Sequence, residues 1–104
     1  MFVVLYRWRV NPSLKQQFVE NWSAISEYLR ENYGSLGSRL HRGNDGIWYS
    51  YAQWKSAEQR EQAFASELGK HNEASEKMKE AIEESFPEIL LETVSDYLIS
   101  TENL

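Results

Sequence analysis

Residues 47–54 read IWYSYAQW, and this stretch decides the fold class that the sequence predicts. Its β-branched and aromatic residues are typical of a β-strand. The preceding residues 43–46 read GNDG, and Gly, Asn and Asp tolerate the positive φ angles of a tight turn. Residues 35–42 show a weaker strand pattern before that turn, so we expect a β-hairpin over residues 35–54.

Upstream of this hairpin, the sequence predicts one strand and one long helix. Residues 2–10 read FVVLYRWRV, which is a strand pattern. Asn11 or Ser13 can cap the start of a helix over residues 13–33, and Gly34 suits its end. In that helix, apolar side chains recur at steps of three and four residues, as on one helical face: Leu14, Phe18, Trp22, Ile25 and Leu29.

Downstream of the hairpin, the sequence predicts further helix and a last strand. Ser56 and Gln59 have the spacing of a capping box, so a second helix begins there. A further helical segment over residues 71–85 is expected to end before Pro87, because proline disfavours a helical conformation in the residue that precedes it. Residues 89–99, which read ILLETVSDYLI, are predicted to form the last strand.

The segment order β-α-β-β-α-β is typical of the α+β ferredoxin-like fold, with one four-stranded antiparallel sheet and its helices on one face. A chain of 104 residues fits one domain, so we assign residues 1–104 to a single domain. The strands at 2–10 and 89–99 carry apolar residues at both alternating sets of positions, whereas a half-solvated sheet should alternate cleanly. The second face therefore needs a cover. A second copy of the chain is the economical one, so we expect a homodimer.

Composition and charge exclude several classes of function. The net charge of −5 would repel a phosphate backbone, so nucleic acid is not an expected partner. The apolar run at residues 2–5 is too short for a signal peptide or a membrane span, so we expect a cytoplasmic protein without membrane contact. The chain has no cysteine, which removes disulfides and zinc–thiolate sites. His71 with Glu73 and Glu76 matches no metal-binding spacing, so no metal is expected.

The third strand and the helix after it resemble those of a known family. The run WYSYAQWKS at residues 48–56, followed by Ala63-Phe64, is similar to the antibiotic biosynthesis monooxygenase family. In that family an aromatic strand ends in Trp-x-Ser before a helix with an Ala-Phe pair. The resemblance implies a dimeric α/β barrel, in which two four-stranded sheets face each other. It implies either cofactor-independent oxidation of aromatic polyketides or haem degradation as the activity.

The haem degraders of this superfamily use an asparagine on the first strand, with a tryptophan and a histidine on the later helices. Tyr6 stands at the approximate place of that asparagine, residues 65–68 contain no tryptophan, and His71 precedes the third helical segment. We therefore expect no haem and no other cofactor. Oxidation without a cofactor needs a pocket for the aromatic ring, a base that favours its anion, and a cation or N–H donor that stabilises charge on oxygen.

Two sets of residues are candidates for these parts. We expect one set to bind the substrate: Tyr6, Trp8, Tyr49 and Trp54. We expect the other set to be catalytic: His41, Tyr51 and Arg39. His41 and Arg39 lie on one face of their strand, and a histidine beside a cation titrates low and stays neutral, as a base must. If this strand is an edge strand, the same two residues only discourage aggregation.

Other residues also have structural alternatives. Trp54 ends a strand just before a helix cap, where a ring often closes the core. Arg7 and Arg9 alternate with apolar residues on the first strand, so they either bind an anion or pair with carboxylates such as Glu92 and Asp96.

Two functions fit the sequence. The first is a cofactor-independent monooxygenase that acts on a small aromatic or quinone-like metabolite. The second is a non-catalytic dimeric module of the same fold, which binds a small ligand or only assembles. An isomerase or cyclase on this fold is a third alternative.

Overall fold

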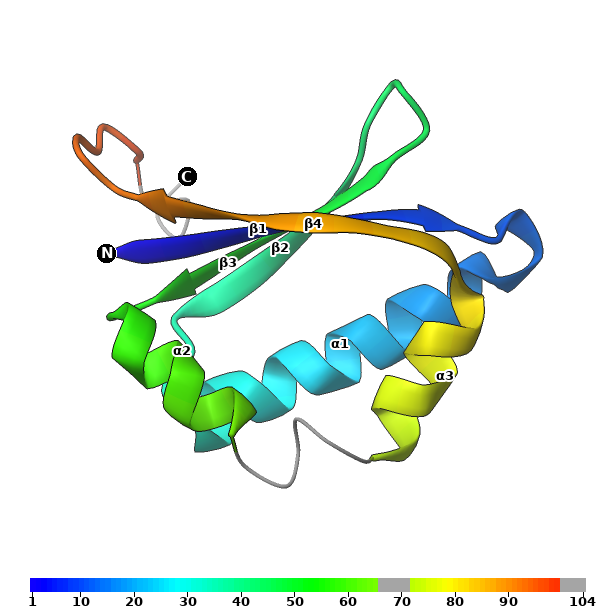
Figure 1. The fold of residues 1–104 in the computed structure, drawn as a ribbon, viewed down its shortest axis with the longest axis horizontal. Helices are drawn as coiled ribbons and strands as arrows, with labels where there is room; N and C mark the ends of the chain where they lie inside the picture. The colour runs from blue at the N-terminus through cyan, green and yellow to red at the C-terminus, as the bar shows by residue number, and fades with distance from the viewer. Residues whose placement is uncertain (66–71, 100–104) are drawn as a thin grey trace.

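The computed structural model describes residues 1–65 and 72–99, and its helices lie on one side of a single sheet (Figure 1). A short 3-10 helix, Pro12–Leu14, precedes the first α-helix. None of the helices in the described ranges is long and apolar enough to cross a membrane. In chain order, the main elements are β1 Phe2–Val10, α1 Lys15–Asn32, β2 Gly37–Arg42, β3 Trp48–Trp54, α2 Ala57–Phe64, α3 Glu73–Ala81 and β4 Ile82–Glu92.

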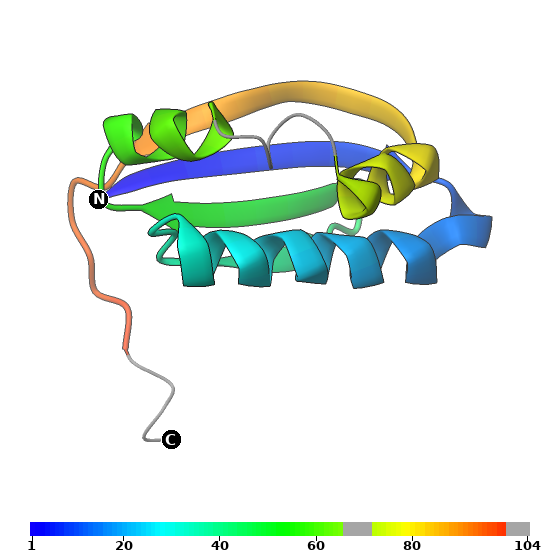
Figure 2. The same ribbon diagram turned by 90° about the horizontal axis from the view of Figure 1, so that it is seen from below.

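The sheet has four strands in the order β2-β3-β1-β4, and every neighbouring pair is antiparallel. β2 and β3 form the predicted hairpin, and β1 lies between β3 and β4. Figure 2 shows α1, α2 and α3 over the same face of the sheet. The predicted α+β ferredoxin-like fold is therefore confirmed.

The helices begin where the sequence places its capping residues. The side chain of Asn11, not that of Ser13, caps the N-terminal turn by accepting a hydrogen bond from the Ser13 backbone N–H. Ser56 Oγ accepts from the Gln59 N–H at 3.1 Å, which confirms the predicted start of α2. Each cap supplies a partner for an N–H group that the first helical turn leaves free. Gly34 follows α1 with φ +78°, a conformation that glycine adopts without steric cost.

The core lies between the sheet and the helices, in two clusters. Near the start of β1, Val4 packs with Leu29 of α1, Trp54 of β3 and Ala63 of α2. At the other end, Phe18 is fully buried and meets Trp8 and Trp48 edge-on, at centroid distances of 5.3 and 5.5 Å. Side chains alternate between the faces of a strand, so even-numbered residues of β1 and β3 point to the helices and odd-numbered residues point to the outer face.

The prediction for the C-terminal part was wrong in its boundaries. α3 ends at Ala81 and β4 runs over Ile82–Glu92, where helix to residue 85 and a strand over 89–99 were expected. β4 can contain Pro87 because this strand is at the edge of the sheet and, in the described residues, pairs only with β1. The pairing shifts register beside the proline, so the missing N–H removes no required hydrogen bond.

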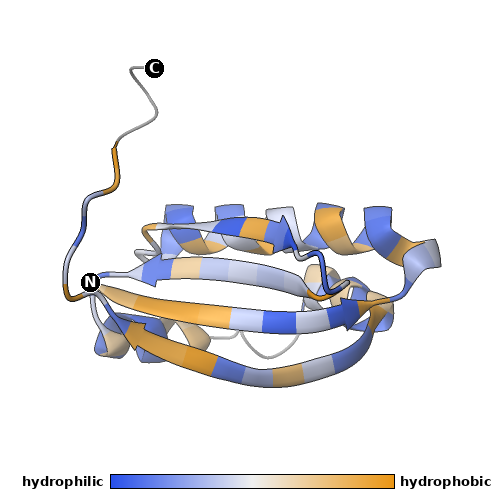
Figure 3. Ribbon diagram, turned by 90° about the horizontal axis from the view of Figure 1, so that it is seen from above, coloured by the Kyte–Doolittle hydropathy of each residue, from blue (hydrophilic) through white to orange (hydrophobic). Residues whose placement is uncertain are grey.

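The outer face of the sheet, opposite the helices, has a hydrophobic end and a more hydrophilic end (Figure 3). The register places Val3 beside Leu91 and Leu5 beside Ile89, which makes one end of this face apolar. Ile89 and Leu91 are 38% and 42% exposed. The expectation that this face is not purely polar is confirmed. At the other end, Arg7 and Arg9 of β1 make the face cationic, and His41 of β2 lies in the row of Tyr49 and Arg7. Arg39 lies nearer the apolar end, in the row of Tyr51 and Leu5.

The partners of the β1 arginines also differ from the expected ones. Arg7 donates to the Pro87 carbonyl oxygen at 2.9 Å, and its guanidinium lies 5.7 Å from the Phe86 ring centre. Arg9 pairs with Glu84 at 3.4 Å. The expected partners, Glu92 and Asp96, are not used because β4 begins earlier in the chain than predicted. Its Phe86 and Glu84 therefore stand opposite these arginines.

Candidate functional site

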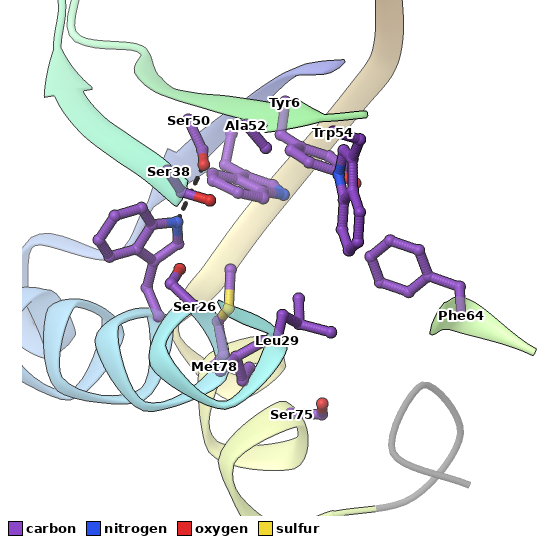
Figure 4. Close-up of a pocket in the computed structure, with 13 residues that line it drawn as sticks. Tyr6, Ser26, Leu29, Ser38, Ser50, Ala52, Trp54, Phe64, Ser75 and Met78 are labelled. Carbon is purple, nitrogen blue, oxygen red and sulfur yellow. Dashed lines mark hydrogen bonds between the residues drawn. The ribbon is translucent and has the colours of Figure 1, made fainter. Parts of the chain in front are cut away.

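A cavity of about 190 Å³ lies between the sheet and the helices (Figure 4). β1 and β3 provide one wall, and α1, α2 and α3 contribute to the others. Figure 4 shows Trp54 and Phe64 at one end of the cavity and Ser26, Ser38 and Ser50 at the other. Ligand pockets for drug-sized molecules span about 300–1,000 Å³, so this cavity suits a smaller molecule, with about one or two rings.

Two stacked aromatic rings on β1 line the cavity. Tyr6 and Trp8 are two residues apart on the strand, so both side chains point to the helices. Their rings stack with an interplanar angle of 1° and a centroid distance of 5.7 Å. A planar aromatic ligand can pack against such rings, because offset stacking of aromatic rings is favourable.

Trp54 lines the cavity and has an unused, buried hydrogen-bond donor. The residue is 1% exposed, and its Nε1 is buried with no hydrogen-bond partner among the described residues. A buried donor without a partner costs roughly 1–3 kcal/mol, so such groups are rare in folded proteins. A ligand oxygen that reached this N–H would remove that cost.

Trp22 organises the serine end of the cavity. The sequence pattern assigns it to the core stripe of α1, and the structure places it on the cavity wall as well. Its Nε1 donates to Ser50 Oγ at 3.0 Å, which is the dashed contact at Ser50 in Figure 4. Because Ser50 Oγ accepts this bond, its own hydroxyl hydrogen is available to a ligand.

Arg60 is a site residue that sequence reasoning missed. Its guanidinium NH2 group donates to the Tyr6 hydroxyl at 3.0 Å and to Glu88 Oε2 at 2.7 Å. The same guanidinium lies 5.0 Å from the Phe64 ring centre. One signal was present in the sequence, because Arg60 and Phe64 are four residues apart on α2 and so share a helix face. Their convergence on Tyr6 depends on tertiary structure.

Burial, rather than this contact, keeps Tyr6 protonated. Burial raises the pKa of Tyr6 above its usual value of about 10, although the positive charge and hydrogen bond of Arg60 oppose the shift. Tyr6 is therefore protonated at neutral pH. Since its oxygen accepts from Arg60, its O–H remains a donor that can face a bound molecule.

The structure separates the predicted site residues into two groups. Three of them line the cavity: Tyr6, Trp8 and Trp54. The others lie on the outer face of the sheet, since they occupy odd-numbered positions: Tyr49, Tyr51, Arg39 and His41. On that face Tyr51 pairs with Arg39, and Tyr49 pairs with His41. The two groups therefore cannot contact the same ligand within one copy, and the catalytic role of the second group stays a prediction.

Tyr49 has a partner of its own on the outer face. Its hydroxyl donates to Asp45 Oδ2 in the hairpin turn, and Asp45 Oδ1 accepts from the Ile47 N–H. The hydrogen bond from Tyr49 lowers the pKa of Asp45. This pair fixes the geometry of the turn that joins β2 to β3.

The lining of the cavity is suited to binding and to stabilising negative charge. Among the described residues, it contains no histidine, carboxylate or basic side chain, and no cluster of potential metal ligands occurs in that part of the chain. The polar groups that line it are indole N–H and hydroxyl groups. Donors of this kind stabilise an oxyanion when they are fixed in a site that excludes water.

The hydrogen bond between Trp22 and Ser50 gives a testable prediction for the serine end. Ser50→Ala is expected to lower the free energy of unfolding by about 1 kcal/mol, because it leaves the Trp22 N–H without its partner. Trp22→Phe removes the donor, so the double variant should lose less than the sum of the two single losses. Urea denaturation of the four proteins measures this coupling. Strictly additive losses would show that the bond contributes nothing.

Comparisons with known proteins place the fold in a family. The family model for antibiotic biosynthesis monooxygenase matches residues 1–84. A candidate antibiotic biosynthesis monooxygenase from Caulobacter crescentus CB15 is similar in structure, with a TM-score of 0.77 and 16% identity over 90% of each chain. A candidate enzyme of the same description from Bordetella bronchiseptica has a TM-score of 0.77 and 14% identity, over 90% of this chain and 97% of the other.

A third similar structure is Rv0793 from Mycobacterium tuberculosis, with a TM-score of 0.74 and 13% identity over 93% of this chain and 98% of the other. At these identities the structural matches show a shared fold. A search of the curated proteins finds no match. Because the family model covers most of the sequence, from β1 into β4, the chain belongs to the antibiotic biosynthesis monooxygenase family.

Proposed function

We propose that this protein is a cofactor-independent monooxygenase, which oxidises a small aromatic or quinone-like metabolite in the cavity between sheet and helices. The observation that carries this proposal is the aromatic cavity, whose lining residue Trp54 also has a buried Nε1 without a partner among the described residues. The protonated Tyr6, held by Arg60, adds a second donor on the same wall. Family membership supports the reaction type.

The reaction needs an electron-rich anion and a place for the charge that develops on oxygen. A phenolic or enolic substrate would stack against Tyr6 and Trp8, with its oxygen toward the Trp54 N–H. The anion donates electrons to dioxygen, and N–H and O–H donors stabilise the charge that forms. The substrate supplies every electron that dioxygen takes up. One oxygen atom enters the product as a new carbonyl oxygen. The substrate loses two hydrogens, both from one CH₂ position or one from a ring C–H and one from the phenolic O–H, and they leave as water with the other oxygen atom.

The lining also narrows the substrate class. No base is present on the described part of the cavity wall, so the substrate itself would have to ionise readily. Naphthols and hydroxynaphthoquinones, which have two rings, meet this condition to different degrees. The rate should then rise with pH through the pKa of the substrate rather than through that of a protein group.

We also propose that the protein acts as a homodimer. The apolar end of the outer face supports this, because Ile89 and Leu91 would otherwise remain in water beside the start of β1. In a barrel of two sheets, the outer faces of the two copies would enclose Arg39, His41 and Tyr51. That arrangement is the one in which these three residues could act on a substrate.

Oxygen consumption without added cofactor tests the proposed reaction. The wild-type protein should consume dioxygen with a naphthol and form the corresponding quinone. Trp54→Phe keeps an aromatic ring but removes the N–H, so kcat/KM should fall by about a hundredfold, as for the loss of one oxyanion donor. Trp48→Phe is the matched control, because Trp48 lies on the same face of β3 but packs against Phe18.

Each outcome of this assay has a distinct meaning. Equal losses in Trp54→Phe and Trp48→Phe would contradict a role for the Trp54 N–H. Binding of these compounds without oxygen consumption would favour the non-catalytic ligand-binding module. A selective loss of turnover in His41→Ala and Tyr51→Phe, with Trp54→Phe fully active, would move the reaction to the outer face of the sheet.

A further inference from the structure

The residues after β4 form an exposed segment, residues 93–99, which we call the C-terminal arm. The arm has no regular secondary structure, and its first residue is tied to β1 by a hydrogen bond from the Thr93 N–H to the Met1 carbonyl oxygen. Figure 1 shows the arm rising on the outer side of the sheet, and Figure 2 shows it running past the N-terminus and away from the domain. Its position therefore leaves it available to another molecule.

The composition of the arm does not suit a segment that stays in water. Its large apolar side chains are almost fully exposed: Val94 92%, Tyr97 93%, Leu98 75% and Ile99 77%. A group of neighbouring exposed apolar residues is typical of an interaction surface. The groove between the arm and the outer face is lined by Val3, Tyr51 and Leu91. The arm is thus continuous with the apolar end of the outer face.

Charge on the outer face identifies what the arm would contact. Arg7 donates to a backbone carbonyl and Arg9 pairs with Glu84, so both have partners within their own copy. Arg39 is exposed and has no hydrogen-bond or ion-pair partner among the described residues. If a second copy covered this face, Arg39 would lose water and need a carboxylate. The arm contains one acidic residue, Asp96.

We infer that the C-terminal arm of one copy lies against the outer sheet face of a second copy, with Asp96 beside Arg39 of that second copy. This inference rests on the proposed homodimer and goes beyond it, because it assigns the arm to the partner's face and names the charge pair. By two-fold symmetry each copy gives one arm and receives one. The exposed apolar side chains of the arm are then buried on the apolar end that the β1–β4 register creates.

Charge exchange between two variants tests whether the contact is between copies. In a dimer of Asp96→Lys, the introduced lysine of each arm faces Arg39 of the other copy, so like charges meet. In a dimer of Arg39→Glu, Asp96 of each arm faces the introduced glutamate of the other copy, so like charges meet again. Each variant alone should therefore dissociate about tenfold more readily than the wild type, measured by sedimentation. A mixture of the two variants should restore the dimer as a heterodimer. In that heterodimer the introduced lysine meets the introduced glutamate at one contact, and the native Asp96 meets the native Arg39 at the other.

A contact within one copy predicts a different result. Each variant would then carry its own repulsive pair in every dimer, so mixing would restore nothing, and only the double variant Asp96→Lys/Arg39→Glu would recover. Restoration by the double variant alone would overturn the inference. Matched charge changes on exposed residues of α1, Lys15→Glu and Glu31→Lys, should leave dissociation unchanged both alone and mixed.

The arm can also be tested through its apolar residues. Tyr97→Ser and Leu98→Ser change side chains that are 93% and 75% exposed, so they cannot unfold the isolated copy. Both should weaken the dimer about tenfold or more. If these variants and both charge reversals leave the dimer as stable as the wild type, the exchange of arms is wrong and the homodimer proposal still holds. A wild-type protein that sediments as a monomer at micromolar concentration would overturn both.

Discussion

Replacing Trp54 with alanine is expected to lower the free energy of unfolding by about 3–5 kcal/mol. The side chain is 1% exposed and packs in one cluster with Val4, Leu29 and Ala63. Its removal therefore leaves a cavity lined by residues of β1, α1 and α2. The melting temperature should fall by more than about 12 °C, since each kcal/mol is worth about 4–8 °C in a domain of this size. Most of the stability of a small domain would be lost.

Urea denaturation followed by circular dichroism measures this loss. Tyr28→Ala is a suitable control, because Tyr28 is an aromatic residue of α1 that is 43% exposed. The control should lose clearly less than half as much as Trp54→Ala. Equal losses in the two variants would contradict the placement of Trp54 in the core.

The second large effect is expected from filling the cavity. Ala52 is 6% exposed and lies on the cavity wall between Ser50 and Trp54, on the same face of β3. Ala52→Leu would project the larger side chain into the space that a ligand needs. Steric overlap of this kind costs about 1–3 kcal/mol, so ligand affinity should fall by about ten- to a hundredfold.

The stability of Ala52→Leu should stay close to that of the wild type, because the added carbon atoms enter an existing cavity. Titration with a hydroxynaphthoquinone or a naphthol measures affinity, and thermal unfolding measures stability. Ala24→Leu, on the exposed side of α1, is the control and should bind as the wild type does. Undiminished binding by Ala52→Leu would show that the ligand binds elsewhere, with the outer face as the next candidate.

The two variants test two different roles of the cavity wall, one in folding and one in ligand binding. Trp54 is needed for folding and also lines the cavity, so its alanine variant cannot isolate function. Ala52 contributes little packing, so its enlargement changes the cavity without removing core contacts. Trp54→Phe is intermediate between these two variants, because it keeps an aromatic ring in the core and loses only the N–H donor and part of the ring.

The error at the C-terminal part of the sequence has a physical cause. Phe86-Pro87 resembles a helix end, and the same pair is acceptable in an edge strand with a register shift. Whether β4 is an edge strand depends on the order of strands in the sheet, which no local pattern contains. The helix was therefore extended four residues too far, from Ala81 to residue 85, and the strand was placed too late.

The sequence by itself determined the hairpin, the helix starts and the fold class. These features depend on short-range physics: the two-residue alternation of strands, the three-to-four-residue spacing of the α1 stripe, and the caps at Asn11 and Ser56. It also predicted four substrate-binding residues, of which Tyr6, Trp8 and Trp54 line one cavity and Tyr49 does not; their role in binding stays a prediction.

Only the tertiary structure decided which face of the sheet holds the cavity, and therefore that Tyr51, Arg39 and His41 lie away from it. It also brought together Arg60, Tyr6 and Glu88, which come from α2, β1 and β4. Such contacts depend on the register between strands and on the packing of helices over them. A single-residue shift in register moves every side chain of a strand to the opposite face, so local sequence patterns do not contain this information.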